Sequence, residues 1–207
     1  MVPFERPSGY PNSISNSDLN THLNELAARR ASLVESPQTP HQARLMAGIL
    51  ERDQVLRTGE YSVTPEISDL YRREAENANR HFNSSGPSPV NRDPLDVAEA
   101  YANYASTLPA GNQRDAALAK AAEYRGTYSS SDAYRREQTR ISEFYRRQGS
   151  TERVSSASVH AEDFRDLRGS LSEVRGEPAK ARIRAQMEAI AIYAREQGWN
   201  MQYFNVR

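Results

Sequence analysis

The sequence predicts an all-α fold of about eight helices. Apolar residues recur at helical spacing, although only 37% of the chain is hydrophobic and its mean hydropathy is −0.82. A capping residue followed by proline opens three of these stretches, at Thr39-Pro40, Thr64-Pro65 and Asp93-Pro94. No segment alternates convincingly with a period of two, so we expect strands to be at most short and terminal.

The first three expected helices occupy the N-terminal part of the chain. The first begins near Ser17, whose side chain can cap it, and continues through Leu33. The second begins at Pro40 and the third at Pro65, each behind a threonine that suits the N-cap position. The stretch 83–92, rich in serine and proline, is then the clearest loop in the chain.

Five more helices are expected after this loop. Their start signals are Asp93-Pro94, Asn112 as the cap of an alanine-rich helix, Ser131-Asp132, the serines from Ser155 to Ser158, and Glu177-Pro178. Gly149 and Gly198 follow the sixth and eighth apolar stripes, where glycine commonly ends a helix.

The chain also contains a partial copy of itself. Residues 60–74 read EYSVTPEISDLYRRE and residues 123–137 read EYRGTYSSSDAYRRE, an offset of 63. The expected helix starts recur with a similar period, which predicts a short α-solenoid-like array of three-helix units of about 65 residues. The alternative is an irregular helical bundle in which similar capping residues recur by chance.

These signals predict a disordered leader at 1–16 and a single helical domain at 17–207. Within the domain we expect units at 17–92, 93–150 and 151–198, followed by an aromatic cap at 199–207. The Ser, Asn and Pro content of the leader resembles the N-termini of bacterial type III secretion effectors. The segment from Ala98 to Arg125 resembles a tetratricopeptide helix pair, but the 34-residue period of that family is absent and nothing is transferred from it.

Composition argues against several classes of protein. The 27 basic and 27 acidic residues balance, so no global field attracts nucleic acid or an anionic membrane. The chain has no cysteine, which excludes disulfides and thiolate metal sites. No apolar run approaches the ~18–20 residues of a membrane span, and the N-terminus does not resemble a Sec signal peptide.

The sequence gives no catalytic, cofactor-binding or metal-binding residue. The histidines His22, His41, His81 and His160 are scattered, and none lies four residues from another. Glycine-rich nucleotide loops and the GxSxG motif of serine hydrolases are absent as well. An enzyme with an active site built from distant, motif-free residues remains an alternative.

Three Tyr-Arg-Arg strings supply the first candidate binding residues: Arg72, Arg73, Arg135, Arg136, Arg146 and Arg147. If the third and sixth helices are equivalent in a repeat, their arginine pairs would form a ladder. Such a ladder suits phosphate or a carboxylate-rich peptide, because each guanidinium can donate two parallel hydrogen bonds. The alternative is a solvated helix face that neighbouring glutamates neutralise.

The C-terminus supplies the second set of candidates, Trp199, Tyr203 and Phe204. One interpretation is that they fold back and cover the last helices, as terminal caps of repeats do. The other is that they form an exposed anchor for a partner, since aromatic residues are enriched in binding hot spots.

We therefore expect a soluble, non-enzymatic protein that binds another protein, including one with an anionic or phosphorylated surface. Of the 27 basic residues only Lys120 and Lys180 are lysines, which indicates either a GC-rich genome or selection in a ubiquitinating host cytosol. With the leader, this favours a bacterial effector secreted into a host cell without a Sec signal. An enzyme acting on a host protein or nucleotide, and a nucleic-acid-binding or phage accessory protein, are the alternatives.

Overall fold

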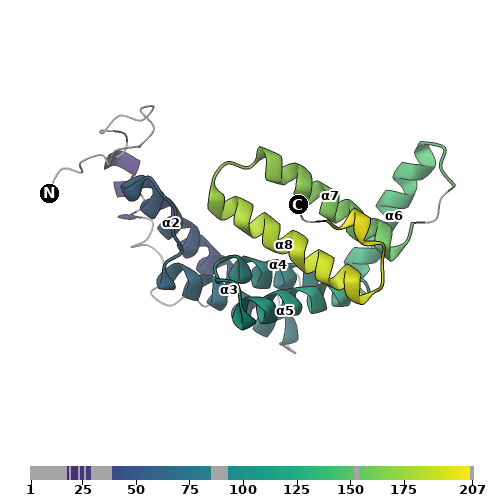
Figure 1. Cartoon of the computed structure of the whole chain (residues 1–207), viewed down its shortest axis with the longest axis horizontal. Coiled ribbons are helices and arrows are strands. Elements are labelled where there is room, and N and C mark those ends of the chain that lie inside the picture. Colours follow the sequence, from purple (N-terminus) through teal and green to yellow (C-terminus); the bar gives the residue numbers. More distant parts are fainter. Residues whose placement is uncertain are drawn as a thin grey trace. The chain divides into compact units, whose positions relative to one another are not determined.

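The computed structural model describes residues 39–84, 93–151 and 154–205, together with isolated helical residues between 18 and 28. The described elements are α2 (Pro40–Thr58), α3 (Pro65–Asn83), α4 (Pro94–Ser106), α5 (Asn112–Tyr128), α6 (Asp132–Arg147), α7 (Ser156–Glu173), α8 (Glu177–Glu196) and the 3₁₀ turn η1 (Met201–Tyr203) (Figure 1). No strand occurs in these ranges, which confirms the all-α class. The predicted leader lies outside the described residues.

The helix starts agree closely with the capping signals. Thr39 accepts a hydrogen bond from the Gln42 amide at 3.2 Å, and the Gln42 side chain accepts one from the Thr39 amide at 3.2 Å. Asp93 and Ser131 cap α4 and α6 by accepting hydrogen bonds from the amides of Leu95 and Tyr134. The expected cap by Asn112 is wrong: Asn112 is already the first residue of α5, because Gly111 takes the N-cap position at φ 145°.

Gly198 directs the C-terminus back onto the last helices. It follows the C-cap of α8 at φ 69°, a left-handed conformation that a residue with a Cβ rarely adopts. The amide of Trp199 then donates to the Ala194 carbonyl at 3.0 Å. The aromatic segment that follows is consequently held against the helices that precede it.

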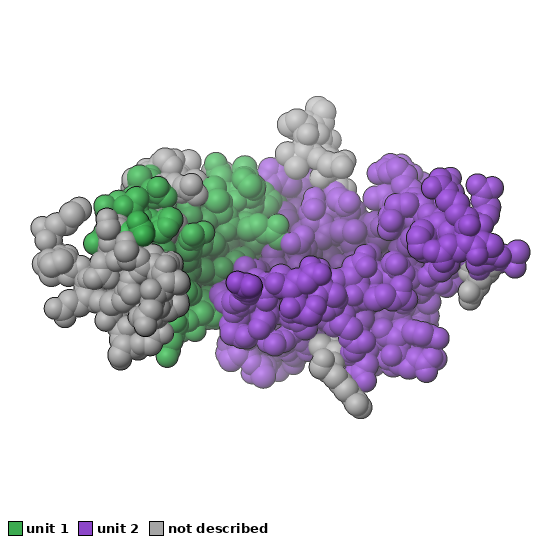
Figure 2. Space-filling model, turned by 90° about the horizontal axis from the view of Figure 1, so that it is seen from above, with its two compact units in different colours: residues 1–77 green, residues 78–207 purple. Residues whose placement is uncertain are grey.

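The chain divides into two compact units, residues 1–77 and 78–207 (Figure 2). The boundary between them falls within α3. In the first unit, Glu51 is 6% exposed and accepts hydrogen bonds from the hydroxyls of Tyr71, at 3.2 Å, and Tyr61, at 3.3 Å. Arg44 pairs with the buried Glu74 at 2.9 Å. Buried charges in this unit are therefore hydrogen-bonded, as burial requires.

Among the described residues of the second unit, buried side chains gather in at least three groups. The first, between α4, α5 and α8, is rich in small residues: Ala102, Ala105, Ala117, Leu118, Ala121, Ala185 and Ala189. The second joins α7, α8 and the C-terminus through Phe164, Met187, Ile190, Ala191, Ala194 and Phe204. The third joins α5, α6 and α7 through Tyr128, Tyr134, Ile141, Val154 and Val159. The candidate residue Phe204 belongs to the second group, and Trp199 packs against it.

The predicted repeat and its unit boundaries remain predictions. Tyr71 and Tyr134 are both buried, as equivalent positions would be, but Tyr71 bonds to Glu51 whereas Tyr134 bonds to Ser156. The second expected pair differs more, since Phe164 is 1% exposed and Tyr101 is half-buried. Among the described residues, no helix is long and apolar enough to cross a membrane.

Candidate functional site

The C-terminal aromatic residues fold back, and they do so in two different ways. The Phe204 ring is 2% exposed and packs edge-on against Phe164 at a centroid distance of 5.8 Å. Trp199 lies over the same core, 6.0 Å from Phe204, whereas Tyr203 is 58% exposed. Phe204 is therefore wrong as an exposed anchor, because the core of α7 and α8 encloses it.

A groove of about 330 Å³ lies beside these residues, and we call it the C-terminal groove. Its walls come from the end of α6, the start of α7 and the C-terminal segment. The lining residues are Tyr145, Val154, Ser155, Ala157, Ser158, Ala161, Glu162, Arg165, Trp199, Asn200, Tyr203 and Phe204. Its volume falls at the lower end of the range for ligand sites.

Aromatic rings and one ion pair dominate the chemistry of the C-terminal groove. Tyr145, Trp199 and Tyr203 offer apolar surfaces with polar tips, a combination common in protein interfaces. Glu162 pairs with Arg165, and its charge is the main influence that raises the pKa of Arg165. The groove walls are consequently close to neutral, and binding there would draw mainly on the aromatic surface.

A second, larger groove of about 680 Å³ lies between α5, α8 and the C-terminal segment. It shares Phe204 with the first groove, and its polar lining includes Asp115, Glu188 and Arg195. Arg114 already binds both oxygens of Glu188. Because Phe204 is the one aromatic residue in its described lining, this groove offers less aromatic surface than the C-terminal groove.

Beneath the C-terminal groove, the fully buried His160 lies at the centre of an aromatic cluster that we call the His160 cage. The centroid of its imidazole lies 5.1 Å from that of Tyr193, 5.4 Å from Trp199, 6.2 Å from Tyr128 and 6.4 Å from Tyr134. Its Nε2 atom is 3.3 Å from the Ser129 hydroxyl oxygen, which is 3.2 Å from the Tyr193 hydroxyl. Four helices and the C-terminal segment thus meet at one side chain.

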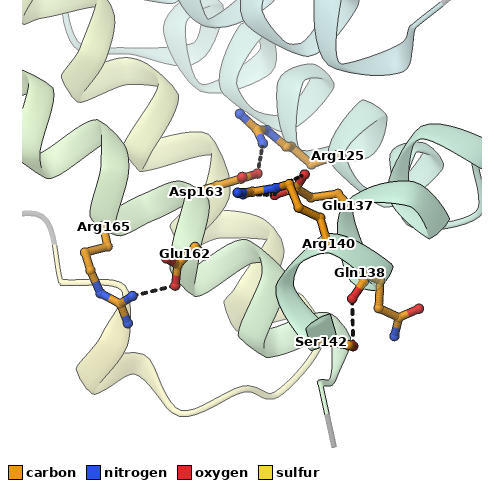
Figure 3. Close-up of polar contacts among 8 residues, drawn as sticks. All are labelled: Arg125, Glu137, Gln138, Arg140, Ser142, Glu162, Asp163 and Arg165. Carbon is orange, nitrogen blue, oxygen red and sulfur yellow. Dashed lines mark hydrogen bonds and ion pairs between the residues drawn. The ribbon is translucent and has the colours of Figure 1, made fainter. Parts of the chain in front are cut away.

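The surroundings of His160 favour its neutral form. Burial, and to a lesser extent the charge of Arg125, lower its pKa to about 3. Arg125 donates to Asp163 at 2.8 Å, next to the Glu137–Arg140 pair of α6 (Figure 3). Burial raises the pKa of the Asp163 carboxyl even though Arg125 acts in the opposite direction.

The contact between Ser129 and His160 resembles a nucleophile next to a base, but the geometry does not suit that chemistry. The imidazole is 0% exposed, and its Nδ1 atom has no hydrogen-bond partner among the described residues. A catalytic base needs an orienting partner and a pKa near the working pH. We therefore interpret the contact as part of the core.

Sequence reasoning missed the role of His160. Its neighbours in the cage come from α5, α6, α8 and the C-terminus, so they are distant in the sequence. Ser129, for example, lies 31 positions before His160. One signal was present in the sequence: His160 directly follows Val159 and precedes Phe164 by four residues, which places it on the buried stripe of α7.

The six candidate arginines are in unequal environments. Arg72 pairs with Asp69 and Glu76, and Arg73 pairs with Asp69. These two therefore fit the neutralised helix face, and Arg72 is the main cause of the lowered pKa of Asp69.

The four candidate arginines of α6 are all exposed. Arg135 pairs with Asp132, and Arg147 lies 3.9 Å from Glu143. Arg136 and Arg146 have no ion-pair partner among the described residues. Because Arg72 and Arg73 belong to the other compact unit, the ladder remains a prediction.

Comparisons with known proteins assign no relative. No family model matches the chain, and no curated protein or solved structure matches it either. Within the described residues, no group of three or more His, Asp or Glu side chains is placed to hold a metal ion.

Proposed function

We propose that the chain is a non-enzymatic protein-binding protein and that the partner docks in the C-terminal groove. The observation that carries this proposal is the arrangement of Tyr145, Trp199 and Tyr203 around one groove. Tyrosine and tryptophan are the residues that most often dominate binding energies in protein interfaces.

The fixed position of the Trp199 side chain and the ordered backbone at Tyr203 support the proposal. The backbone amide of Trp199 donates a hydrogen bond to the Ala194 carbonyl, and its ring contacts the rings of His160 and Tyr193. Tyr203 belongs to η1, which Asn200 caps by accepting from the Gln202 amide at 3.1 Å. Side chains that are already ordered lose less entropy on binding, which improves affinity.

The end of α6 favours an anionic partner. Arg146 and Arg147 directly follow Tyr145, and both are exposed. Carboxylates or phosphates on the partner suit these side chains, because a guanidinium donates two parallel hydrogen bonds to either group.

Site-specific cross-linking tests this proposal. A photoreactive phenylalanine analogue at Tyr203 should form a discrete cross-linked product in lysate, whereas the same analogue at Leu45, which is 44% exposed in the other unit, should not. Without a cross-linker, Tyr203→Ala should bind the partner identified in this way ~30-fold more weakly than the unmodified chain, since hot-spot residues contribute about 2 kcal/mol or more. Equal cross-linking at both positions, or capture unchanged by Tyr203→Ala, would contradict the proposal.

We extend the proposal to the setting in which the protein acts. The effector-like composition of residues 1–16 and the scarcity of lysine support a bacterial protein delivered into a host cell. Residues 1–16 fused to a reporter enzyme that is active only inside host cells should direct its delivery. A reporter signal no higher than that of an unrelated 16-residue leader would contradict this part.

A further inference from the structure

One side of the His160 cage is formed by α6, which buries few residues against the rest of the unit. Of the 16 residues of α6, all of which the structure describes, Tyr134 and Ile141 are buried. By comparison, α7 buries three residues and is also packed along α8, whereas α5 and α8 each bury seven. Elements with little buried apolar surface open at lower free-energy cost than the rest of a fold, so α6 is the helix of this unit most ready to detach.

Few polar contacts add to this attachment. The Tyr134 hydroxyl lies 2.8 Å from the Ser156 hydroxyl, and the Gln138 side chain donates to the Val154 carbonyl at 3.2 Å. The Glu137–Arg140 pair of α6 approaches Asp163 of α7, but Arg140 is largely exposed, and ion pairs of this kind contribute little (Figure 3). Gly149, at φ 80°, follows the helix and gives the chain a turn about which α6 can move.

A charged His160 is poorly accommodated while α6 is in place. The titratable and charged groups that contact it or act on its charge are Arg125 and Tyr128 of α5, Tyr134 of α6 and Tyr193 of α8. None of these is an anion at neutral pH, and Asp163, three residues further along α7, is engaged by Arg125. The buried Nδ1 atom also has no acceptor among the described residues. Exposure to water would therefore lower the free energy of an imidazolium at this position.

We propose that the second unit contains an acid-triggered switch, in which protonation of His160 is coupled to detachment of α6 from α5 and α7. Opening would also withdraw Tyr145 and so remove one wall of the C-terminal groove. That consequence rests on the proposed function, whereas the switch itself does not.

The expected response follows from the two protonation equilibria of His160. Its pKa is about 3 with the cage closed, and its ordinary value of 6.5 applies with α6 open. The closed form is therefore fully favoured above pH 6.5 and loses its advantage tenfold for each pH unit below it. A drop from pH 6.5 to 4.5 should raise the open population ~50-fold through His160 alone. Asp163 acts in the opposite direction, because its raised pKa favours the closed form on acidification.

Hydrogen exchange of the full chain tests the switch. Exchange is measured at pH 7 and pH 4.5 and corrected for the intrinsic pH dependence of amide exchange. Amides of α6 should lose ~70-fold of their protection relative to amides of α5 and α8. His160→Gln, which cannot titrate, should abolish this relative loss, and Asp163→Asn should retain it.

Two further measurements keep the test decisive if His160→Gln does not fold. Ile141→Ala should raise the exchange of α6 at pH 7 and retain the additional rise at pH 4.5. Trp199 is the only tryptophan and lies 5.4 Å from His160, so its fluorescence should change over the same pH range as α6 exchange. Constant relative protection of α6, simultaneous loss in all helices, or an unchanged response in folded His160→Gln would overturn the proposal. None of these readouts depends on a partner, so their failure would leave the proposed function intact.

Discussion

Tyr203 and Phe204 show how two adjacent aromatic residues take different roles. Phe204 fills the space between α7 and α8, while Tyr203 is exposed at the rim of the C-terminal groove. The sequence predicted that the segment would either fold back or serve as an anchor. The structure divides these two roles between neighbours, and side-chain direction in an irregular segment has no periodic signal that could have shown this.

The first prediction concerns this pair. Phe204→Ala should lower the free energy of unfolding by about 3–5 kcal/mol, because it removes a buried ring and leaves a cavity. Tyr203→Ala is the matched control and should change it by about 0.5 kcal/mol or less, as surface substitutions usually do. Urea unfolding followed by circular dichroism measures both, and equal losses would contradict the assignment of the two side chains.

The second prediction concerns Tyr128 at high pH. Burial raises the pKa of its phenol to about 12 from 10.0, so stability from this group is fully present below pH 10 and is lost as the pH rises towards 12. The hydroxyl of Tyr128 has no hydrogen-bond partner among the described residues. Tyr128→Phe should therefore leave stability at pH 7 nearly unchanged and reduce the alkaline loss. Urea midpoints at pH 7 and pH 11 test this, and parallel loss in both proteins would contradict it.

At the scale of elements, helix starts were the most predictable feature. The caps at Thr39, Asp93 and Ser131 depend on residues two or three positions away, so local sequence contains the required information. The packing partners of each helix depend on distant residues and could not be read in this way. The light attachment of α6 is an example, since its apolar stripe in the sequence resembles those of better-buried helices.

The third prediction concerns the start of α7, which forms one wall of the C-terminal groove. Ser155 accepts from the Ser158 amide at 3.2 Å in a capping box. Ser155→Ala should lower the free energy of unfolding by about 1 kcal/mol through loss of this cap. Ser170→Ala, at an exposed position inside the same helix, should be neutral or slightly stabilising, because alanine favours helix. A cost at Ser170 equal to that at Ser155 would show that capping is not the cause.

At the scale of the whole molecule, composition and periodicity were sufficient for the all-α class. They did not reveal that the chain divides into units at residue 77, inside a continuous helix, because helical periodicity shows no interruption there. The repeat of about 65 residues remains a prediction, and the different partners of Tyr71 and Tyr134 show that similar sequence strings can occupy different surroundings.

The fourth prediction concerns the leader. Residues 1–16 carry few apolar side chains, so their deletion should leave the thermal midpoint and the helical circular dichroism unchanged. A fall of several degrees in the midpoint would show that the leader contributes to the fold.

The second unit is built around a neutral His160 enclosed by aromatic rings. Nitrogen-detected NMR of the His160 imidazole, assigned by comparison with His160→Gln, measures its protonation state. We expect a single neutral tautomer in the closed form from pH 8 down to about pH 4, because burial lowers the pKa to about 3, and any imidazolium seen in this range should belong to the form with α6 open. A titration midpoint near the ordinary value of about 6.5 would contradict it, since the imidazole would then be accessible to water in the native state.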